Sequence, residues 1–150
     1  MLSAGDQFPE FALQDGEGTL VTLKSLLGSS FVMYFYPKDD TSGCTVEACQ
    51  FNETLPNFGD IKVIGVSPDP VKSHQKFATK FDLQFTLLSD PDKSLCQSVG
   101  VWVEKSMYGK KYMGVERTSF LVGQDGVVIH VWNKVKPDGH AAEVLTRAKQ

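Results

Sequence analysis

The run SFVMYFYP, residues 30–37, limits the folds open to this chain more than any other stretch. After its first serine it contains no charged side chain and none of the polar residues that mark a solvent-facing strand. A strand exposed on one face alternates apolar and polar residues, whereas a strand buried on both faces is apolar throughout. Pro37 ends the run, because proline has no N–H to donate to a neighbouring strand. The sequence therefore predicts a central strand in a sheet that is covered on both faces.

The segments around this strand predict how the sheet continues. Residues 45–58 have apolar side chains at roughly helical spacing, and residues 61–67 return to strand character, so we expect a βαβ unit with parallel strands. The other expected elements are a hairpin over 11–23, a helix over 70–83, a strand over 85–90, a short helix over 92–100, a hairpin over 117–133 and a terminal helix from near Asp138. This order predicts an α/β fold with a central mixed β-sheet flanked by helices and an N-terminal β-hairpin.

Length and charge narrow the class of protein. A chain of 150 residues predicts one domain, 1–150, with its own core. The 18 acidic residues exceed the 15 basic ones and neither sign is clustered, which argues against binding to nucleic acid or to a membrane. The sequence opens without a basic segment followed by an apolar run, and no apolar run is long enough to span a bilayer. We therefore expect a cytoplasmic location.

Two of the three cysteines, Cys44 and Cys49, lie five positions apart. In a reducing compartment, cysteines that stand out by position are more often catalytic or metal-binding than structural. Cys44 follows a polar turn at the expected start of a helix, where unpaired N–H groups and the helix dipole favour the thiolate over the thiol. Thr41, one turn earlier, is placed to direct its hydroxyl at the same sulfur. The pattern predicts a reactive Cys44.

The spacing of the two cysteines predicts a conformational change. Helix geometry puts the Cα atoms of positions i and i+5 roughly 8.6 Å apart, beyond the limit of roughly 7 Å for a disulfide. Cys44 and Cys49 therefore cannot bond within an intact helix. If they act as a pair, the first turns of the helix must unfold during the reaction.

Arg117 is a third candidate for the site. The chain has two arginines, and Arg117 enters an apolar strand whereas Arg147 lies in the expected terminal helix. A permanently charged guanidinium at the start of a strand is suited to stabilising an anion. Only the fold can bring it to Cys44.

Other interpretations of these residues remain open. The two cysteines with His74, His130 and His140 offer zinc-ligand types, although the spacing is unusual for zinc. A cysteine–histidine hydrolase would need a histidine beside Cys44, which the sequence does not show. Cys96 fits the apolar face of a short helix, so packing is favoured over a role as a spare resolving thiol.

The motif Pro37-x-x-x-Thr41-x-x-Cys44 resembles the Pro-x-x-x-Thr-x-x-Cys loop of the peroxiredoxins. The stretch YFYPKDDTSGCTVEAC, with Cys49 five residues after Cys44, is similar in particular to the bacterioferritin comigratory protein or PrxQ subfamily. This resemblance covers most of the chain. It implies a thioredoxin-like fold and a thiol peroxidase that reduces hydrogen peroxide and organic hydroperoxides, with thioredoxin as electron donor and without a metal or cofactor.

The resemblance also implies roles for individual residues. Cys44 corresponds to the peroxidatic cysteine and Cys49 to the resolving cysteine, which forms a disulfide with it in the same chain. Thr41 and Arg117 correspond to residues that activate the thiol and bind peroxide, and Pro37 to the residue that shields it from water. An intrachain partner removes one need for a dimer, so we expect a monomer.

Ser42 departs from the subfamily, which commonly has Thr-Pro-Gly-Cys where this chain has Thr-Ser-Gly-Cys. The loop before Cys44 is therefore expected to be less rigid. Two other classes stay possible. One is a binding or chaperone module switched by disulfide formation, and the other is a thiol–disulfide exchanger, which the absence of Cys-x-x-Cys disfavours.

Overall fold

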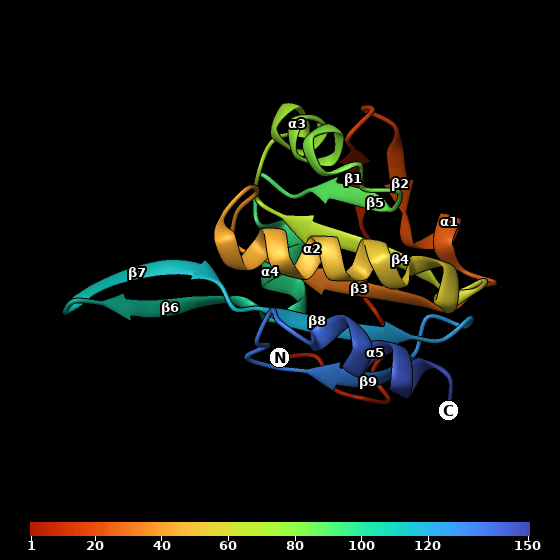
Figure 1. Ribbon diagram of the computed structural model, residues 1–150. Coiled ribbons are helices and arrows are strands. Elements are labelled where there is room, and N and C mark those ends of the chain that lie inside the picture. The colour runs from red at the N-terminus through yellow and green to blue at the C-terminus, as the bar shows by residue number, and fades with distance from the viewer.

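The computed structural model describes residues 1–150, which form a seven-stranded mixed sheet and a separate two-stranded sheet (Figure 1). The strand order in the large sheet is β2-β1-β5-β4-β3-β8-β9. Its strands are β1 (Ala12–Asp15), β2 (Leu20–Thr22), β3 (Phe31–Phe35), β4 (Lys62–Ser67), β5 (Thr86–Ser89), β8 (Thr118–Val122) and β9 (Val128–Trp132).

The strand β3 lies inside this sheet, as its apolar sequence predicts. It pairs in parallel with β4 on one side and antiparallel with β8 on the other. All five of its residues are buried. Between β3 and β4 the chain forms the helix α2 (Ser42–Thr54), which confirms the predicted βαβ unit.

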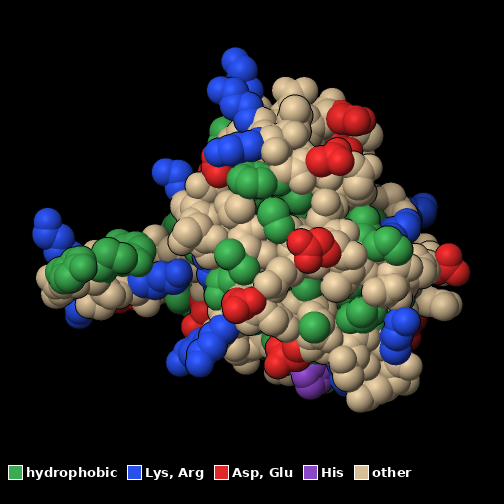
Figure 2. Space-filling model, in the orientation of Figure 1, with side chains coloured by type: hydrophobic (Ala, Val, Ile, Leu, Met, Phe, Trp, Pro, Cys, Tyr) green, Lys and Arg blue, Asp and Glu red, His purple; other side chains and the backbone are tan.

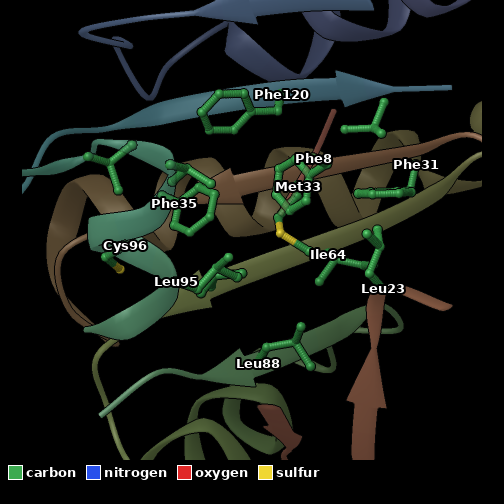
Figure 3. Close-up of a cluster of buried hydrophobic side chains, with 14 of the residues drawn as sticks. Phe8, Leu23, Phe31, Met33, Phe35, Ile64, Leu88, Leu95, Cys96 and Phe120 are labelled. Carbon is green, nitrogen blue, oxygen red and sulfur yellow. The ribbon is translucent and has the colours of Figure 1, made fainter. Parts of the chain in front are cut away.

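Alternate side chains of β3 point to opposite faces of the sheet and supply two cores. Phe31, Met33 and Phe35 belong to a cluster on one face, shown in Figure 3, whereas Val32 and Tyr34 belong to a second cluster. The helices α1 (Leu23–Leu26) and α4 (Ser94–Val99) contribute to the first cluster; α2, α3 (Val71–Phe81) and α5 (His140–Ala148) contribute to the second. Each large apolar side chain buried in these cores stabilises the fold by about 1.5–3 kcal/mol.

Both predicted hairpins of the large sheet are present. The strands β1 and β2 pair antiparallel, and so do β8 and β9. In the first hairpin, Asp15 Oδ1 accepts hydrogen bonds of 2.9 Å from the N–H groups of Glu17 and Thr19. Gly18 in the same turn has φ 81°, a value that glycine adopts without strain.

The arm over residues 102–115 is an element that the sequence analysis did not predict. The strands β6 (Trp102–Met107) and β7 (Lys110–Val115) pair only with each other and project from the body of the molecule (Figure 1). Hydrophobic and basic side chains gather on this arm (Figure 2), and Tyr108 at its tip is 99% exposed. Because most of the arm packs against nothing, its strands lack the apolar alternation by which a half-buried strand is identified.

The remaining helices begin close to the residues predicted from the sequence. The helix α3 begins one residue after the predicted start, α4 begins two residues after its predicted start and ends next to Gly100, and α5 begins two residues after Asp138. The four-residue helix α1 and a 3₁₀ turn over Leu55–Phe58 were not predicted as separate elements. No helix combines the length and the apolar character needed to cross a membrane.

Candidate active site

Cys44 is the third residue of α2 and points into the core. Asp40, with φ 57°, turns the chain after β3, and Thr41 in the extended conformation precedes the helix. The Thr41 carbonyl accepts the N–H of Thr45 at 2.8 Å and so begins the helix. The Thr41 side chain accepts no hydrogen bond from α2. The N–H groups in the first turn of the helix are therefore not capped by Thr41. Cys44 itself is 1% exposed.

Two predicted site residues, Thr41 and Pro37, lie on the loop that leads to Cys44. The Thr41 hydroxyl donates to the carbonyl of Lys38 at 3.0 Å, and the residue is exposed. Pro37 is half-buried and follows Tyr36, whose N–H still donates to Val66 of β4 at 3.0 Å. In this structure the Thr41 hydroxyl is therefore used within the loop, while Pro37 ends the pairing of the strand.

Arg117 reaches the first turn of α2 through the fold. It precedes β8, the neighbour of β3, and its side chain is 19% exposed. A Cβ atom on Gly43 would lie 2.8 Å from Arg117 Nη2, so the absence of a side chain at Gly43 gives the guanidinium its place beside the turn that carries Cys44. Sequence analysis predicted that only the fold could join Arg117 to this loop.

Glu47 holds Arg117 and is a residue that the sequence analysis missed. Arg117 Nη1 donates to Glu47 Oε1 at 3.3 Å, and Glu47 is 1% exposed. Burial raises the pKa of Glu47 to about 7, against the opposing charge and hydrogen bond of Arg117. An acidic residue three positions after Cys44, on the inward face of the same helix, is the signal that could have identified it.

Lys105, in the middle of β6, adds another cation. Its side chain lies across Gly114, where a Cβ atom would be 3.3 Å from Lys105 Cδ. Burial, and then the charge of Arg117, lower the pKa of Lys105. The arm therefore places positive charge on the same side of the molecule as Arg117.

Cys49 lies in the same unbroken helix as Cys44, and both are free thiols. It is partly exposed, and burial followed by the charge of Glu53 raises its pKa. The helix is intact from Ser42 to Thr54, so a bond between the two sulfurs requires part of α2 to unfold.

Cys96 lies across the sheet from Cys44. It belongs to the cluster of Phe35 and Leu95 (Figure 3), whereas Cys44 belongs to the cluster on the opposite face. Cys96 is completely buried, and burial together with the nearby Asp90 carboxylate raises the pKa of its thiol strongly. Both observations favour packing as the role of Cys96.

Two of the three histidines are bonded to groups other than the cysteines, His130 packs edge-on against Trp132, and no cysteine belongs to a cluster of possible metal ligands. Both ring nitrogens of His74 are hydrogen-bonded, to Asp39 and to the Leu88 carbonyl, and those of His140 to Ser119 and Glu143. The structure therefore does not assemble the cysteine–histidine zinc site or the hydrolase dyad that the sequence left open. One group of three possible ligands, Asp39, Asp69 and His74, is close together, but its members already bond to one another or to neighbouring side chains.

The arrangement around Cys44 is suited to a nucleophile. The thiol sits in the first turn of a helix whose dipole favours an anion, and a guanidinium lies against that turn. As charge develops on the leaving group, fixed N–H donors can stabilise it without reorganisation.

Comparison with known proteins identifies the family of this chain. The model of the AhpC/TSA family matches residues 4–131. The chain is 48% identical to a putative peroxiredoxin bcp of Coxiella burnetii, over 97% of this chain and 98% of the relative, and 42% identical to peroxiredoxin Bcp of Escherichia coli, over 99% and 97%.

Solved structures show the same fold. The bacterioferritin comigratory protein of Xanthomonas campestris superposes with a TM-score of 0.90 at 43% identity, and a cysteine-to-serine variant of Xylella fastidiosa PrxQ with 0.94 at 39% identity. In both cases 99% of this chain and 96% of the other chain are covered. These likenesses confirm the thioredoxin-like fold. The chain belongs to the AhpC/TSA family, and within it to the peroxiredoxins of the Bcp and PrxQ type.

Proposed function

We propose that this peroxiredoxin is a thiol-dependent peroxidase in which Cys44 attacks hydrogen peroxide and organic hydroperoxides. The observation that carries the assignment is the placement of a thiol in the first turn of α2 with the Arg117 guanidinium against Gly43 in the same turn. In the Xanthomonas relative, the solved structures concern alkyl peroxide reduction.

In the first step the Cys44 thiolate attacks the nearer oxygen of the hydroperoxide. A sulfur–oxygen bond forms and the O–O bond breaks, so that Cys44 becomes a sulfenic acid and the alcohol or water leaves with a proton. Arg117 and the N–H groups of the helix start stabilise the charge on the two oxygens, and Thr41 contributes its hydroxyl once the substrate competes for it. Pro37 helps to keep bulk water from the sulfur.

In the second step Cys49 resolves the sulfenic acid. Its sulfur bonds to that of Cys44, the S–O bond breaks, and the Cys49 proton leaves with the oxygen as water. Thioredoxin, or another dithiol of the reducing cytoplasm, then returns both thiols by exchange. No metal or cofactor takes part. Because both sulfurs belong to one chain, the cycle can run in a monomer.

The test is peptide mapping by mass spectrometry after one equivalent of hydrogen peroxide, on the wild type and on Cys44→Ser, Cys49→Ser and Cys96→Ser variants. We expect a Cys44–Cys49 disulfide that thioredoxin removes, and a sulfenic acid on Cys44 when Cys49 is replaced. A Cys44–Cys96 disulfide would overturn the choice of resolving thiol. An unmodified Cys44 would overturn the peroxidase and favour a redox-switched binding module.

A further inference from the structure

The loop between β3 and α2 is anchored by a buried carboxylate, that of Asp39. Asp39 is 7% exposed, and three groups donate to it or lie within hydrogen-bond distance. The Tyr36 hydroxyl bonds to Oδ1 at 2.6 Å, while Ser73 Oγ and His74 Nδ1 each lie 2.7 Å from Oδ2. The Asp39 N–H also donates to Asp69 at 2.8 Å. Asp39 therefore ties the loop to α3 and to the end of β4.

His74, on α3, is held at both of its ring nitrogens. His74 Nε2 lies 2.8 Å from the carbonyl oxygen of Leu88, which can only accept, so Nε2 carries a proton. Nδ1 lies 2.7 Å from Asp39 Oδ2. Burial would raise the pKa of Asp39, but the hydrogen bond and charge of His74 outweigh it and hold the pKa below its ordinary value. His74 has no exposed surface, so its contact with Asp39 is shielded from water.

A second anchor lies at Gln50, the residue directly after Cys49. Its side-chain amide donates to Asp138 Oδ1 at 2.7 Å, and its oxygen accepts the N–H of Gly139 at 2.8 Å. Asp138 and Gly139 immediately precede α5. The middle of α2 is therefore bonded through one side chain to the start of another helix.

The segment between the two anchors, residues 40–49, is held less firmly by polar contacts. Asp40 pairs with Lys80 at 2.8 Å, but both side chains are about half exposed, and such pairs contribute little. Glu47 bonds to Arg117 at the longer distance of 3.3 Å. The segment contains Cys44 and Cys49, whose sulfurs must meet if the proposed second step occurs.

We propose that the residues of the Asp39–His74 contact and of the Gln50 clamp are positioning residues for disulfide formation, because they fix the two ends of the segment that unfolds. The proposal rests on the Cys44–Cys49 pairing of the proposed function. Unfolding is confined to residues 40–49, so the sulfurs are released from the helix while the chain ends stay near each other. When a dithiol reduces the bond, the anchored ends direct the helix to form again.

Hydrogen exchange of the reduced and the oxidised protein tests these boundaries directly. We expect faster amide exchange in the oxidised form over residues 40–49 and also over 50–53, whose N–H groups bond to carbonyls of the unfolding segment, with protection retained at Asp39, Thr54 and Leu55. In Gln50→Ala the fast exchange should extend to Thr54 and Leu55. Fast exchange throughout α2 of the oxidised wild type would overturn the clamp. An exchange pattern in Gln50→Ala that is identical to that of the wild type would overturn it as well.

The N-terminal anchor is tested by comparing Asp39→Asn with Asp40→Asn, two neighbouring carboxylates changed in the same way. After a single peroxide pulse, the rates of sulfenic acid and disulfide formation are followed by rapid quenching and mass spectrometry. Asp39→Asn weakens the anchor that holds this end of the segment near Cys49, so disulfide formation should be slower by roughly threefold and sulfinic acid should rise. Asp40→Asn should change either by less than about twofold.

His74→Gln removes the same contact from its other side and should slow disulfide formation in the same way, and the double variant should be no slower than the slower single variant. If Asp39→Asn lowers the melting temperature but leaves the partition between disulfide and sulfinic acid unchanged, the Asp39–His74 contact is only structural. If Cys44 forms no sulfenic acid, or bonds to Cys96, the proposed function fails instead. The two failures therefore give different products.

Discussion

Cys44 and Cys96 occupy the same position in two different helices. Each is the third residue of its helix, each is essentially buried, and both are free. They differ in what meets the N–H groups at the helix start. At α4, the Asp90 carboxylate accepts from Leu95 and Cys96 at 3.3 and 2.9 Å. At α2 the Thr41 side chain does not cap the first turn, and the charged group nearby is the Arg117 guanidinium.

We infer from this difference that a helix start does not by itself make a thiol reactive. The N–H groups and the dipole favour a thiolate only when another anion has not already taken that place. Asp90 takes it at Cys96 and, together with burial, raises the pKa of that thiol. At α2 the same donors remain for the sulfur and its substrate.

Removing each thiol in turn should give the largest contrast. Cys44→Ser should lower peroxidase turnover by at least about 1,000-fold, because a serine hydroxyl is a far weaker nucleophile at neutral pH. Cys96→Ala should leave turnover within about twofold and cost on the order of 1 kcal/mol of stability from lost packing. Coupled thioredoxin assays and denaturant unfolding measure the two effects. Comparable losses of turnover in both variants would contradict the prediction that only Cys44 is the reactive thiol.

Arg117 should account for much of what distinguishes Cys44. Arg117→Ala should slow sulfenic acid formation by roughly 100-fold, because a donor aimed at developing charge is lost. Arg147→Ala, in the terminal helix, is the matched control and should change the rate little. Stopped-flow kinetics on the first oxidation report the difference, and an unchanged rate for Arg117→Ala would remove it from the site.

The pKa of Glu47, on the same helix as Cys44, predicts that the stability of the protein depends on pH. In the unfolded chain Glu47 ionises near its ordinary value of 4.5, and in the folded protein near 7. Between these values the folded protein keeps a proton that the unfolded chain has lost, so stability falls as the pH rises, by roughly 3 kcal/mol in all. Urea unfolding from pH 4 to 8 should show this fall in the wild type and not in Glu47→Gln. Parallel curves for the two proteins would contradict the assignment.

Ser42→Pro should have the smallest effect. Ser42 is the first residue of α2, where proline is favoured, and Thr41 before it is already extended, as a residue preceding proline must be. The variant should gain about 0.5–1 kcal/mol of stability and form the disulfide a few times more slowly, because the helix start unfolds less easily. Thermal unfolding and quenched-flow mapping test this, and faster disulfide formation would show that rigidity at residue 42 does not limit the step.

Much of the fold could be predicted because its signals are local. The apolar run 30–37, the turn sequences Asp-Gly-Glu-Gly and Gln-Asp-Gly, and the helical spacing after Cys44 each specify an element without reference to distant residues. The position of β5 between β4 and β1 has no such signal, since it depends on contacts made only in the folded sheet. The arm of β6 and β7 was missed because most of its residues are exposed, so its sequence lacks the alternation of apolar and polar residues that identifies a strand.

The candidate site was predictable in part for the same reason. Cys44, Cys49 and Thr41 lie in one short stretch, Arg117 was singled out by its charge at the start of an apolar strand, and the likeness to a known motif added the role of Pro37. Glu47 was missed although it lies three residues after Cys44 on the same face of the helix, because acidic residues are usually exposed and its position was not weighed against that expectation. The pairing of Asp39 with His74, 35 residues apart, leaves no trace in spacing.

The contact between Gly43 and Arg117 also determines which substitutions this chain can tolerate during evolution. Any other amino acid at residue 43 would bring a Cβ atom to 2.8 Å from the guanidinium, and Glu47 holds that group from the other side. The neighbouring Ser42 is exposed and can vary alone. A lineage descended from this sequence could therefore exchange residue 42 in one step, whereas a change at residue 43 would displace Arg117 unless its surroundings changed as well.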